Sequence, residues 1–427
     1  MAITTYKAGK RTWLRGARCP ICHKDDWCLL SEDHKTALCM RVDHGKDNEK
    51  LYGGSLYYLD GNKIEVPSEI SNWESQPIAS SSHLHVVYSL VADLFGLTNQ
   101  DQEHLEKKRG LTREQGALRK YFSTDFDTLK KQVSDKKTIW PQLFKEYGLK
   151  QDAWKGVPGF YYDKKNKCPV FMTKPGIAIP CRNQYGQITG LQVRVHQEEI
   201  AYFVKNISNK QYDVYVKNID GDAVYSVRNI DNPDKVENGK ATGFVQLKHL
   251  NLSFEIKSGP KYVWVSSREE YLGTSAQAGT HFAYPDELLL KAKFDQRGYS
   301  LVNLWELTDK KVVVTEGLLK SDIAISHLEN EGLGNMADVV VAIPGVSFWK
   351  KAIDLLVYLE AGRMISAFDQ DFKVNKAVKG YMEQLIDYSI DHDLETYLLT
   401  WEVGKGIDDV LLTNLPYEDK GWNIFVY

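Results

Sequence analysis

Residues 363–371 of the chain read RMISAFDQD, an apolar run that ends in two aspartates. The run has the composition of a buried strand, and Asp369 and Asp371 follow it directly. Side chains alternate along a strand, so residues i and i+2 point the same way. Two carboxylates held on one side of a strand end repel each other and lose hydration. We therefore expect a positive charge between them.

Strands and helices alternate on both sides of this stretch. The candidate strands are apolar throughout and lie at 310–317 (KKVVVTEG), 337–346 (ADVVVAIPGV), 363–371 and 395–403 (ETYLLTWEV). A helical pattern follows each of the first three. Continuous apolar strands that alternate with helices indicate a parallel sheet buried on both faces. The sequence predicts an α/β domain with a parallel sheet over residues 305–427.

Acidic residues follow three of these strands. Their positions are Glu316, then Asp369 with Asp371, then Asp408 with Asp409. In open parallel sheets, ligands bind at the carboxyl ends of the strands, and carboxylate oxygens suit Mg²⁺ or Mn²⁺. We predict that these five carboxylates bind catalytic Mg²⁺ or Mn²⁺ for phosphoryl or nucleotidyl transfer.

A cluster of cysteines near the N-terminus predicts a structural Zn²⁺ site over residues 1–60. The chain has six cysteines, and the four that we expect to bind tetrahedral Zn²⁺ are Cys19, Cys22, Cys28 and Cys39. Two strand-like runs with a turn at 33–35 place Cys28 opposite Cys39. His44 or, less readily, His34 could replace Cys28. So small a ribbon would depend on the metal for its stability.

The segment 80–300 has a mixed α+β pattern. Residues 80–150 have helical periodicity, and 177–194 (IAIPCRNQYGQITGLQVR) has the pattern of a hairpin with Arg182 and Arg194 at the ends of its arms. A β-rich insertion follows at 197–257, and Lys261 lies just after it in a Gly-Pro turn. The sequence thus predicts a multidomain protein that combines α+β and α/β folds.

The composition is that of an ordinary globular protein. The chain has 427 residues, a formal net charge of −3 and 26% charged residues. Residues 1–24 contain six Lys or Arg and no acid, although the whole chain is not a polycation. No apolar run approaches the roughly 20 residues of a membrane span, and the N-terminus lacks the apolar stretch of a signal peptide. We expect a cytoplasmic protein without membrane contact.

The C-terminal pattern, E-G after one strand and D-x-D after a later one, resembles the toprim domain. A zinc ribbon, a mixed domain and a toprim domain in this order resemble the bacterial DnaG-type primases. The resemblance is closest to the toprim-bearing primase-like proteins of phages and mobile elements. The stretches 106–115 (EKKRGLTREQ), 177–194 and 259–267 (GPKYVWVSS) are similar to primase segments. The similarity covers about 1–60, 100–195 and 258–415 and leaves the insertion unexplained.

The resemblance implies roles for particular residues. Glu316 would be the catalytic acid, with Asp369 and Asp371 as further metal ligands. The residues that would bind template or nucleotide phosphates are Arg182, Arg194, Lys261 and Lys320. Many primases have an aspartate four residues after the glutamate, where this chain has Lys320, and Asp322 follows two residues later. One late carboxylate is also missing or shifted.

We therefore expect a DNA primase-like nucleotidyl transferase that makes short RNA primers on single-stranded DNA. Its partners would be the DNA template, NTPs and a helicase or other replication protein of the same element. One alternative is a toprim nuclease. The basic hairpin argues against it, because a nuclease has no need of such a hairpin. The other is a non-catalytic nucleic-acid or nucleotide binder, which the changes among the acids favour.

Overall fold

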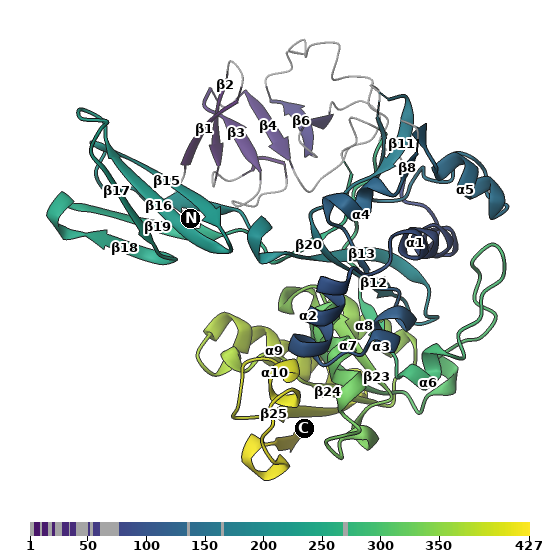
Figure 1. The fold of residues 1–427 in the computed structure, drawn as a ribbon. Helices are drawn as coiled ribbons and strands as arrows, with labels where there is room; N and C mark the ends of the chain where they lie inside the picture. The colour runs from purple at the N-terminus through teal and green to yellow at the C-terminus, as the bar shows by residue number, and fades with distance from the viewer. Residues whose placement is uncertain are drawn as a thin grey trace. The chain divides into compact units, whose positions relative to one another are not determined.

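The computed structural model divides the chain into two compact units, residues Met1–Ser75 and Gln76–Tyr427 (Figure 1). The residues that the structure describes are 4–8, 11–15, 19–21, 28–33, 35–39, 50–51, 54–59, 77–134, 137–163, 166–267 and 272–427. We call the two parts the N-terminal unit and the second unit, and describe each by itself.

The N-terminal unit contains a six-stranded antiparallel sheet in the order β1-β2-β3-β4-β6-β5. Its strands are β1 (Thr4–Ala8), β2 (Arg11–Arg15), β3 (Leu29–Ser31), β4 (Thr36–Cys39), β5 (Lys50–Leu51) and β6 (Gly54–Tyr58). The buried apolar cluster on this sheet is small, with Trp13, Leu38 and Leu56 at its centre. With so few apolar side chains buried in its described part, a sheet of this size would depend on another source of stability.

The second unit begins with helices packed on a four-stranded antiparallel sheet, in the order β20-β13-β12-β7. Its strands are β7 (Phe122–Ser123), β12 (Gly176–Arg182), β13 (Ile188–Val195) and β20 (Tyr262–Trp264). The helices are α1 (Ser81–Phe95), α2 (Asn99–Arg109), α3 (Arg113–Leu118), α4 (Phe126–Lys130) and α5 (Trp140–Glu146). The buried side chains of α1 recur every three or four residues and pack against β13. Two short hairpins, β8 (Val133–Ser134) with β9 (Lys137–Thr138) and β10 (Phe160–Asp163) with β11 (Cys168–Phe171), complete this part.

The insertion forms a small sandwich of two three-stranded sheets. One sheet contains β14 (Tyr202–Lys205), β19 (Leu252–Ser258) and β18 (Gly243–Leu247), and the other contains β15 (Tyr212–Ile219), β16 (Asp222–Asn229) and β17 (Val236–Lys240). Buried apolar residues of both sheets share one cluster, in which Tyr225 meets Phe254 edge-on with ring centroids 5.3 Å apart. The segment therefore has a core of its own.

The C-terminal part of the second unit is built on a six-stranded sheet, which we call the C-terminal sheet. Its order is β21-β23-β22-β24-β25-β26. The strands are β21 (His281–Ala283), β22 (Lys311–Glu316), β23 (Val339–Ile343), β24 (Arg363–Ser366), β25 (Glu395–Thr400) and β26 (Asn423–Val426). The inner four strands are parallel, whereas β21 and β26 pair antiparallel at the two edges. The sheet is thus mixed rather than wholly parallel.

Apolar residues cover both faces of this sheet. Val312 and Val314 pack with α8 (Trp349–Tyr358) and α9 (Lys376–Ile390), whereas Val313 packs on the opposite face with α7 (Leu318–His327) and α10 (Ile407–Leu411). Full burial of one such side chain contributes about 1.5–3 kcal/mol, which explains the apolar runs in the sequence. Among the described residues, no helix has both the length and the apolar character that crossing a membrane requires.

The C-terminal sheet and the four-stranded sheet meet at a shared core. Edge strand β21 precedes residue 305, so the sheet includes a strand from the segment that we assigned to the mixed domain. Ile177 and Ile179 of β12 belong to one buried cluster with Leu318 and Ile323 of α7. The two parts are therefore one compact unit, in agreement with the single boundary near residue 75.

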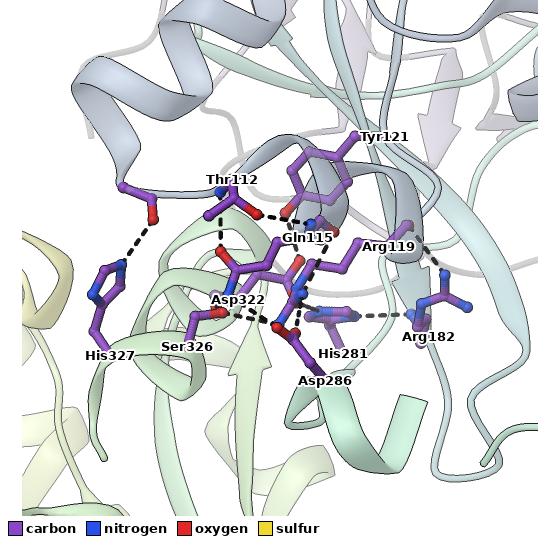
Figure 2. A network of polar contacts seen from close by, with 11 residues as sticks. Thr112, Gln115, Arg119, Tyr121, Arg182, His281, Asp286, Asp322, Ser326 and His327 are labelled. Atoms are coloured by element: carbon purple, nitrogen blue, oxygen red, sulfur yellow. Dashed lines mark hydrogen bonds and ion pairs between the residues drawn. The ribbon is translucent and has the colours of Figure 1, made fainter. Parts of the chain in front are cut away.

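A buried polar network centred on Asp322 of α7 lies at the same meeting point (Figure 2). The Tyr121 hydroxyl donates to Asp322 Oδ2 at 2.5 Å, and Arg119 Nε lies 3.3 Å from Oδ1. His281 Nε2 lies 3.4 Å from the same oxygen, while its Nδ1 accepts from the backbone N–H of Arg182 at 2.9 Å. Because Nδ1 is the acceptor, Nε2 carries the proton and donates to the carboxylate.

Further contacts extend from Arg119. Its Nη1 contacts Asp286 Oδ1 at 2.6 Å and its Nη2 donates to Ser326 Oγ at 2.9 Å. Burial alone would raise the pKa of Asp322, but His281 and then Arg119 and Tyr121 hold that pKa below its usual value. The aspartate is therefore ionised at neutral pH and holds α7 against residues 119–121.

We predict that Asp322→Asn lowers the free energy of unfolding at pH 7 by about 3 kcal/mol, because loss of one buried charge leaves Arg119 without its interior partner. A carboxyl whose pKa is depressed by folding stabilises the protein above its unfolded pKa, and this contribution is lost as pH falls through the folded value. The deficit of the variant, measured by urea unfolding, should therefore shrink below about pH 4.

Asp286→Asn is the matched control, since its side chain is 36% exposed and shares the same arginine. It should cost about 1 kcal/mol or less. Equal losses of unfolding free energy in both variants would show that the burial of Asp322 does not determine its contribution to stability.

Candidate functional site

The carboxyl edge of the C-terminal sheet gathers acidic residues at the point where the strand order reverses. From β22 the chain goes to β23 on one side, and from β24 it goes to β25 on the other. Glu316 ends β22, Asp369 and Asp371 follow β24, and Asp408 lies in α10 after β25. We call these four residues the acid edge. Such a reversal is where open α/β sheets bind ligands.

The two aspartates of the opening stretch are not on a strand. β24 ends at Ser366, and Asp369 precedes a single 3₁₀ turn, η8 (Gln370–Lys373), that contains Asp371. The prediction that strand alternation aligns them is therefore wrong. They nevertheless approach the same group, because the turn brings both side chains to Lys405.

Two lysines provide the positive charge between these aspartates. Lys320, in the first turn of α7, pairs with Asp369 Oδ1. Lys405 Nζ lies 3.2 Å from Asp369 Oδ2 and 3.1 Å from Asp371 Oδ2. The hydrogen bond to Asp371 and then the one to Asp369 raise the pKa of Lys405. Its amino group is therefore protonated at neutral pH.

Asp408 is buried and forms an ion pair with one cation. Arg109, the last residue of α2, places Nη1 3.5 Å from Asp408 Oδ2. Asp408 Oδ1 is buried without a hydrogen-bond partner among the described residues. A Cβ built on Gly406 would lie 2.5 Å from this oxygen and 2.9 Å from Lys320 Nζ, so the absence of a side chain there leaves room for both.

Asp409 has a structural role. Its Oδ2 accepts from the backbone N–H groups of Gly406 at 2.9 Å and Lys405 at 3.2 Å, which caps the start of α10. The negative charge of the carboxylate also interacts favourably with the positive, N-terminal end of the helix dipole. The prediction that Asp409 binds metal does not agree with this arrangement.

Burial, with a smaller contribution from neighbouring carboxylates, raises the pKa of two carboxyl groups at the acid edge. Burial raises the pKa of Glu316, and the nearby Asp369 raises it further. Burial also raises the pKa of Asp408, against the lowering effect of Lys320. An additional cation nearby would stabilise the ionised form of both groups.

The donors at the acid edge suit a hard divalent cation, but they are not gathered around a single point. Carboxylate oxygens are the ligands that Mg²⁺ and Mn²⁺ prefer. Across the described residues, the only group of three or more acidic, His or Cys ligand atoms within 4.8 Å of one another is a set of cysteines. The five-carboxylate arrangement that we expected is thus replaced by carboxylates paired with ammonium groups. Glu316 is the member that has no ion pair among the described residues, whereas Asp371 pairs with Lys405.

Arg182 does not occupy a position on the surface. It is buried, its Nη1 donates to the carbonyl of Gly186 at 2.8 Å and its Nη2 to that of Arg119 at 3.0 Å. Burial lowers its pKa to about 10. With both ends occupied by carbonyls, this side chain fastens the hairpin to residues 119–121. The expectation that it contacts template phosphates is not compatible with this position.

Arg194 lies on β13, and Lys261 directly precedes the neighbouring edge strand β20. Arg194 pairs with Tyr262 across β13 and β20, and the carbonyl of Lys261 accepts from Val195 N–H at 2.9 Å. Lys261 is exposed and Arg194 is half-buried. Burial and then Arg109 lower the pKa of Arg194, against a contact with Tyr262 that raises it.

His104 lies near both Arg194 and Arg109, which act on its pKa. Burial, and then Arg194 and Arg109, lower its pKa to about 4. Its Nε2 is buried without a hydrogen-bond partner in the described part of the chain. Since Arg109 also reaches Asp408, positive groups lead from β13 to the acid edge.

The N-terminal unit contains a candidate zinc centre. The Sγ atoms of Cys19, Cys28 and Cys39 are buried and lie within 4.8 Å of one another, with 3.9 Å between Cys28 and Cys39. Tetrahedral Zn²⁺ with Zn–S bonds of about 2.3 Å separates its sulfur ligands by about 3.8 Å. The donors therefore fit Zn²⁺.

The strand register explains how two of these cysteines meet. Leu29 pairs with Leu38 and Leu30 with Ala37, so the same register places Cys28 opposite Cys39, as predicted. Of the other predicted ligands, Cys22, His34 and His44 lie outside the described residues.

Sequence reasoning missed Arg109 and Lys405. Arg109 ends a run of three basic residues, and nothing local separates it from Lys107 and Lys108. Lys405 carries a weak signal, because it stands between two glycines directly before the late aspartates. Contacts across the fold, rather than spacing, identify both.

Comparisons with known proteins give a limited result. No protein-family model matches the chain, and no curated protein matches it. Among solved structures, it is similar to the zinc-binding and RNA polymerase domains of Aquifex aeolicus primase, at 13% identity and a TM-score of 0.43, over 99% of this chain and 81% of that one.

Two further solved structures are similar at the same level. The RNA polymerase domain of Mycobacterium tuberculosis primase DnaG, in complex with double-stranded DNA, gives 12% identity and a TM-score of 0.43 over 80% of each chain. The catalytic core of E. coli primase gives 12% identity and a TM-score of 0.40 over 80% and 79%. Because TM-scores below 0.5 do not establish a shared fold, the functional assignment depends on the residues of this chain.

We predict that purified protein contains about one zinc per chain. Cys28→Ser and Cys39→Ser should each lose most of it, because a serine hydroxyl is a poor substitute for a thiolate, and both should unfold the N-terminal unit at lower temperature. Elemental analysis and thermal melting measure the two effects.

Cys168→Ser is the control, because this cysteine lies on β11 in the second unit. It should leave zinc content unchanged. Zinc-free wild-type protein, or variants that keep their zinc, would rule out the centre.

Proposed function

We propose that the chain is a metal-dependent nucleotidyl transferase of the primase type, which makes short RNA primers on single-stranded DNA. The observation that supports this proposal is the acid edge at the strand-order reversal, with Arg109 in contact with Asp408. Nucleotidyl transfer requires carboxylates for a divalent cation and positive groups for phosphates in one place. Both are present here, and the predicted E-G and D-x-D motifs supply the carboxylates.

Glu316 and Asp371 would hold the divalent cation, with Asp369 next to them. A cation bound there would help to ionise the attacking 3′-hydroxyl and would neutralise charge on the departing pyrophosphate. Burial and then Asp369 raise the pKa of Glu316, and a cation bound there would favour the ionised carboxylate against both effects. Lys320 and Arg109 would then hold phosphate oxygens of the incoming nucleotide.

The template would run along the positive groups that lead away from the acid edge. Arg194 and Lys261 would contact backbone phosphates without reading base sequence. Arg182 is left out of this path because it is buried.

The remaining parts of the chain have supporting roles in this proposal. The zinc ribbon over 1–60, with the basic segment 1–24, would bind template. Residues 80–300 would form the core that guides it, and 305–427 would be the catalytic toprim-like part. A helicase or other replication protein of a phage or mobile element is the expected partner.

One observation favours a second candidate function. Lys320 and Lys405 neutralise Asp369 and Asp371 within the protein. These carboxylates therefore need a metal ion less than carboxylates without an ion pair would. A non-catalytic binder of nucleotides or nucleic acid would have this property. Incubation with single-stranded DNA, labelled NTPs and Mg²⁺ or Mn²⁺ separates the candidates: new oligonucleotides for a primase, shortened template for a nuclease, and neither for a binder.

We predict that Asp371→Asn and Glu316→Gln each lower primer synthesis by more than about 100-fold, since even outer-shell partners of a metal are worth about 10–100-fold. Both variants should stay folded, because neutralising one of several repelling carboxylates does not remove a stabilising contact of the core. Asp387→Asn, on the exposed side of α9, is the control and should retain full activity. Primer synthesis that survives in both acid variants would exclude catalysis at the acid edge.

A second prediction concerns the template path. Arg194→Ala and Lys261→Ala should weaken binding of single-stranded DNA at all sequences. Each should also lower the slope of log K against log salt concentration by about 0.7, the value for one phosphate contact on a single strand. Fluorescence anisotropy over a salt series measures both quantities. Lys350→Ala on α8, a lysine of another part of the second unit, should leave the slope unchanged. Slopes equal to wild type in the first two variants would place the template elsewhere.

A further inference from the structure

Lys320 holds an unusual position for a lysine. Its side chain is only 25% exposed and pairs with Asp369, whose side chain is 11% exposed. Its Nζ and the unpaired Oδ1 of Asp408 both lie against Gly406, at 2.9 and 2.5 Å from where a Cβ on that glycine would be. One ammonium group is thus paired with Asp369 and lies near a second buried carboxylate, that of Asp408, without forming an ion pair with it.

The side chain of Lys405 can be displaced from its carboxylates more easily than that of Lys320. Its side chain is 61% exposed although its Nζ bridges Asp369 and Asp371. Its backbone is fastened on both sides, since its carbonyl accepts from Gln370 N–H at 2.9 Å and its N–H donates to Asp409 at 3.2 Å. The side chain can therefore swing into solvent without moving the loop.

The charges at the acid edge nearly balance without any metal. The four carboxylates Glu316, Asp369, Asp371 and Asp408 carry −4, and Lys320, Lys405 and Arg109 carry +3. The formal sum is −1. One divalent cation can be accommodated when Lys405 withdraws, because the remaining charge is then −2. Two divalent cations would face the ammonium of Lys320 at close range with too few carboxylates to offset them.

We propose that the ammonium of Lys320 takes the place of one divalent cation, and that the acid edge binds a single divalent ion at Glu316 and Asp371 on displacement of Lys405. This inference rests on the function proposed above only in naming the same site as the place of nucleotidyl transfer. It gives the two lysines different tasks: Lys320 is a fixed positive charge, and Lys405 is a replaceable one.

The test is a titration of the zinc-loaded full chain with Mn²⁺, in which electron paramagnetic resonance reports free Mn²⁺ in the absence of DNA and nucleotide. Wild type should bind one tight Mn²⁺ and Asp371→Asn none. Lys405→Met should bind one ion at least about tenfold more tightly, because the competing charge is gone. Lys320→Asp, which exchanges the ammonium for a carboxylate, should bind two. Lys379→Met, an exposed lysine of α9 paired with Glu383, should match wild type.

Two tight ions in wild type, or none, would overturn the proposal. An affinity unchanged in Lys405→Met would do the same. If Lys320→Asp fails to fold by circular dichroism, Lys320→Met decides: one ion with tighter binding supports the proposal, and unchanged affinity contradicts it. Primer synthesis is assayed separately. A chain that binds one Mn²⁺ but makes no oligonucleotide keeps this inference and loses the proposed function, whereas an active chain with two ions does the reverse.

Discussion

The buried carboxylate of Asp322 is the contact on which the arrangement of the second unit depends. It joins Tyr121 and Arg119, which follow α3, to His281 of β21 and to its own helix α7. An interior charge without these partners would be strongly destabilising, so the contacts of Asp322 favour the way in which the two sheets meet. Because α7 starts directly after Glu316, the same contact sets the position of Lys320 and of the acid edge relative to α2.

That position has a chemical consequence. α2 ends at Arg109 beside Asp408, so the positive groups that extend to β13 begin where the carboxylates end. A site for phosphate transfer needs both kinds of charge within a few ångströms. Here they come from parts of the chain about 300 residues apart, and the shared apolar core around α7 keeps them together. Arg182, although basic, serves that core and not the site.

Much of the fold could be predicted from patterning, while the contacts of the site could not. The apolar run 310–317 predicts β22, since burial on two faces requires apolar residues at every position. The spacing of Cys28 and Cys39 predicts their approach, because a hairpin fixes its own register. Asp369 and Asp371 were expected on a strand, but their strand ends at Ser366. Local sequence does not determine such an end.

The sequence by itself determined the order of elements, the cysteine cluster and the presence of carboxylates after parallel strands, because these follow from side-chain periodicity and from spacing along the chain. The tertiary structure alone decided which charges face one another. It pairs Lys320 and Lys405 with Asp369, turns Asp409 into a helix cap and buries Arg182. Electrostatic energies depend on distance and burial. For residues that are far apart in the sequence, their spacing along the chain predicts neither quantity.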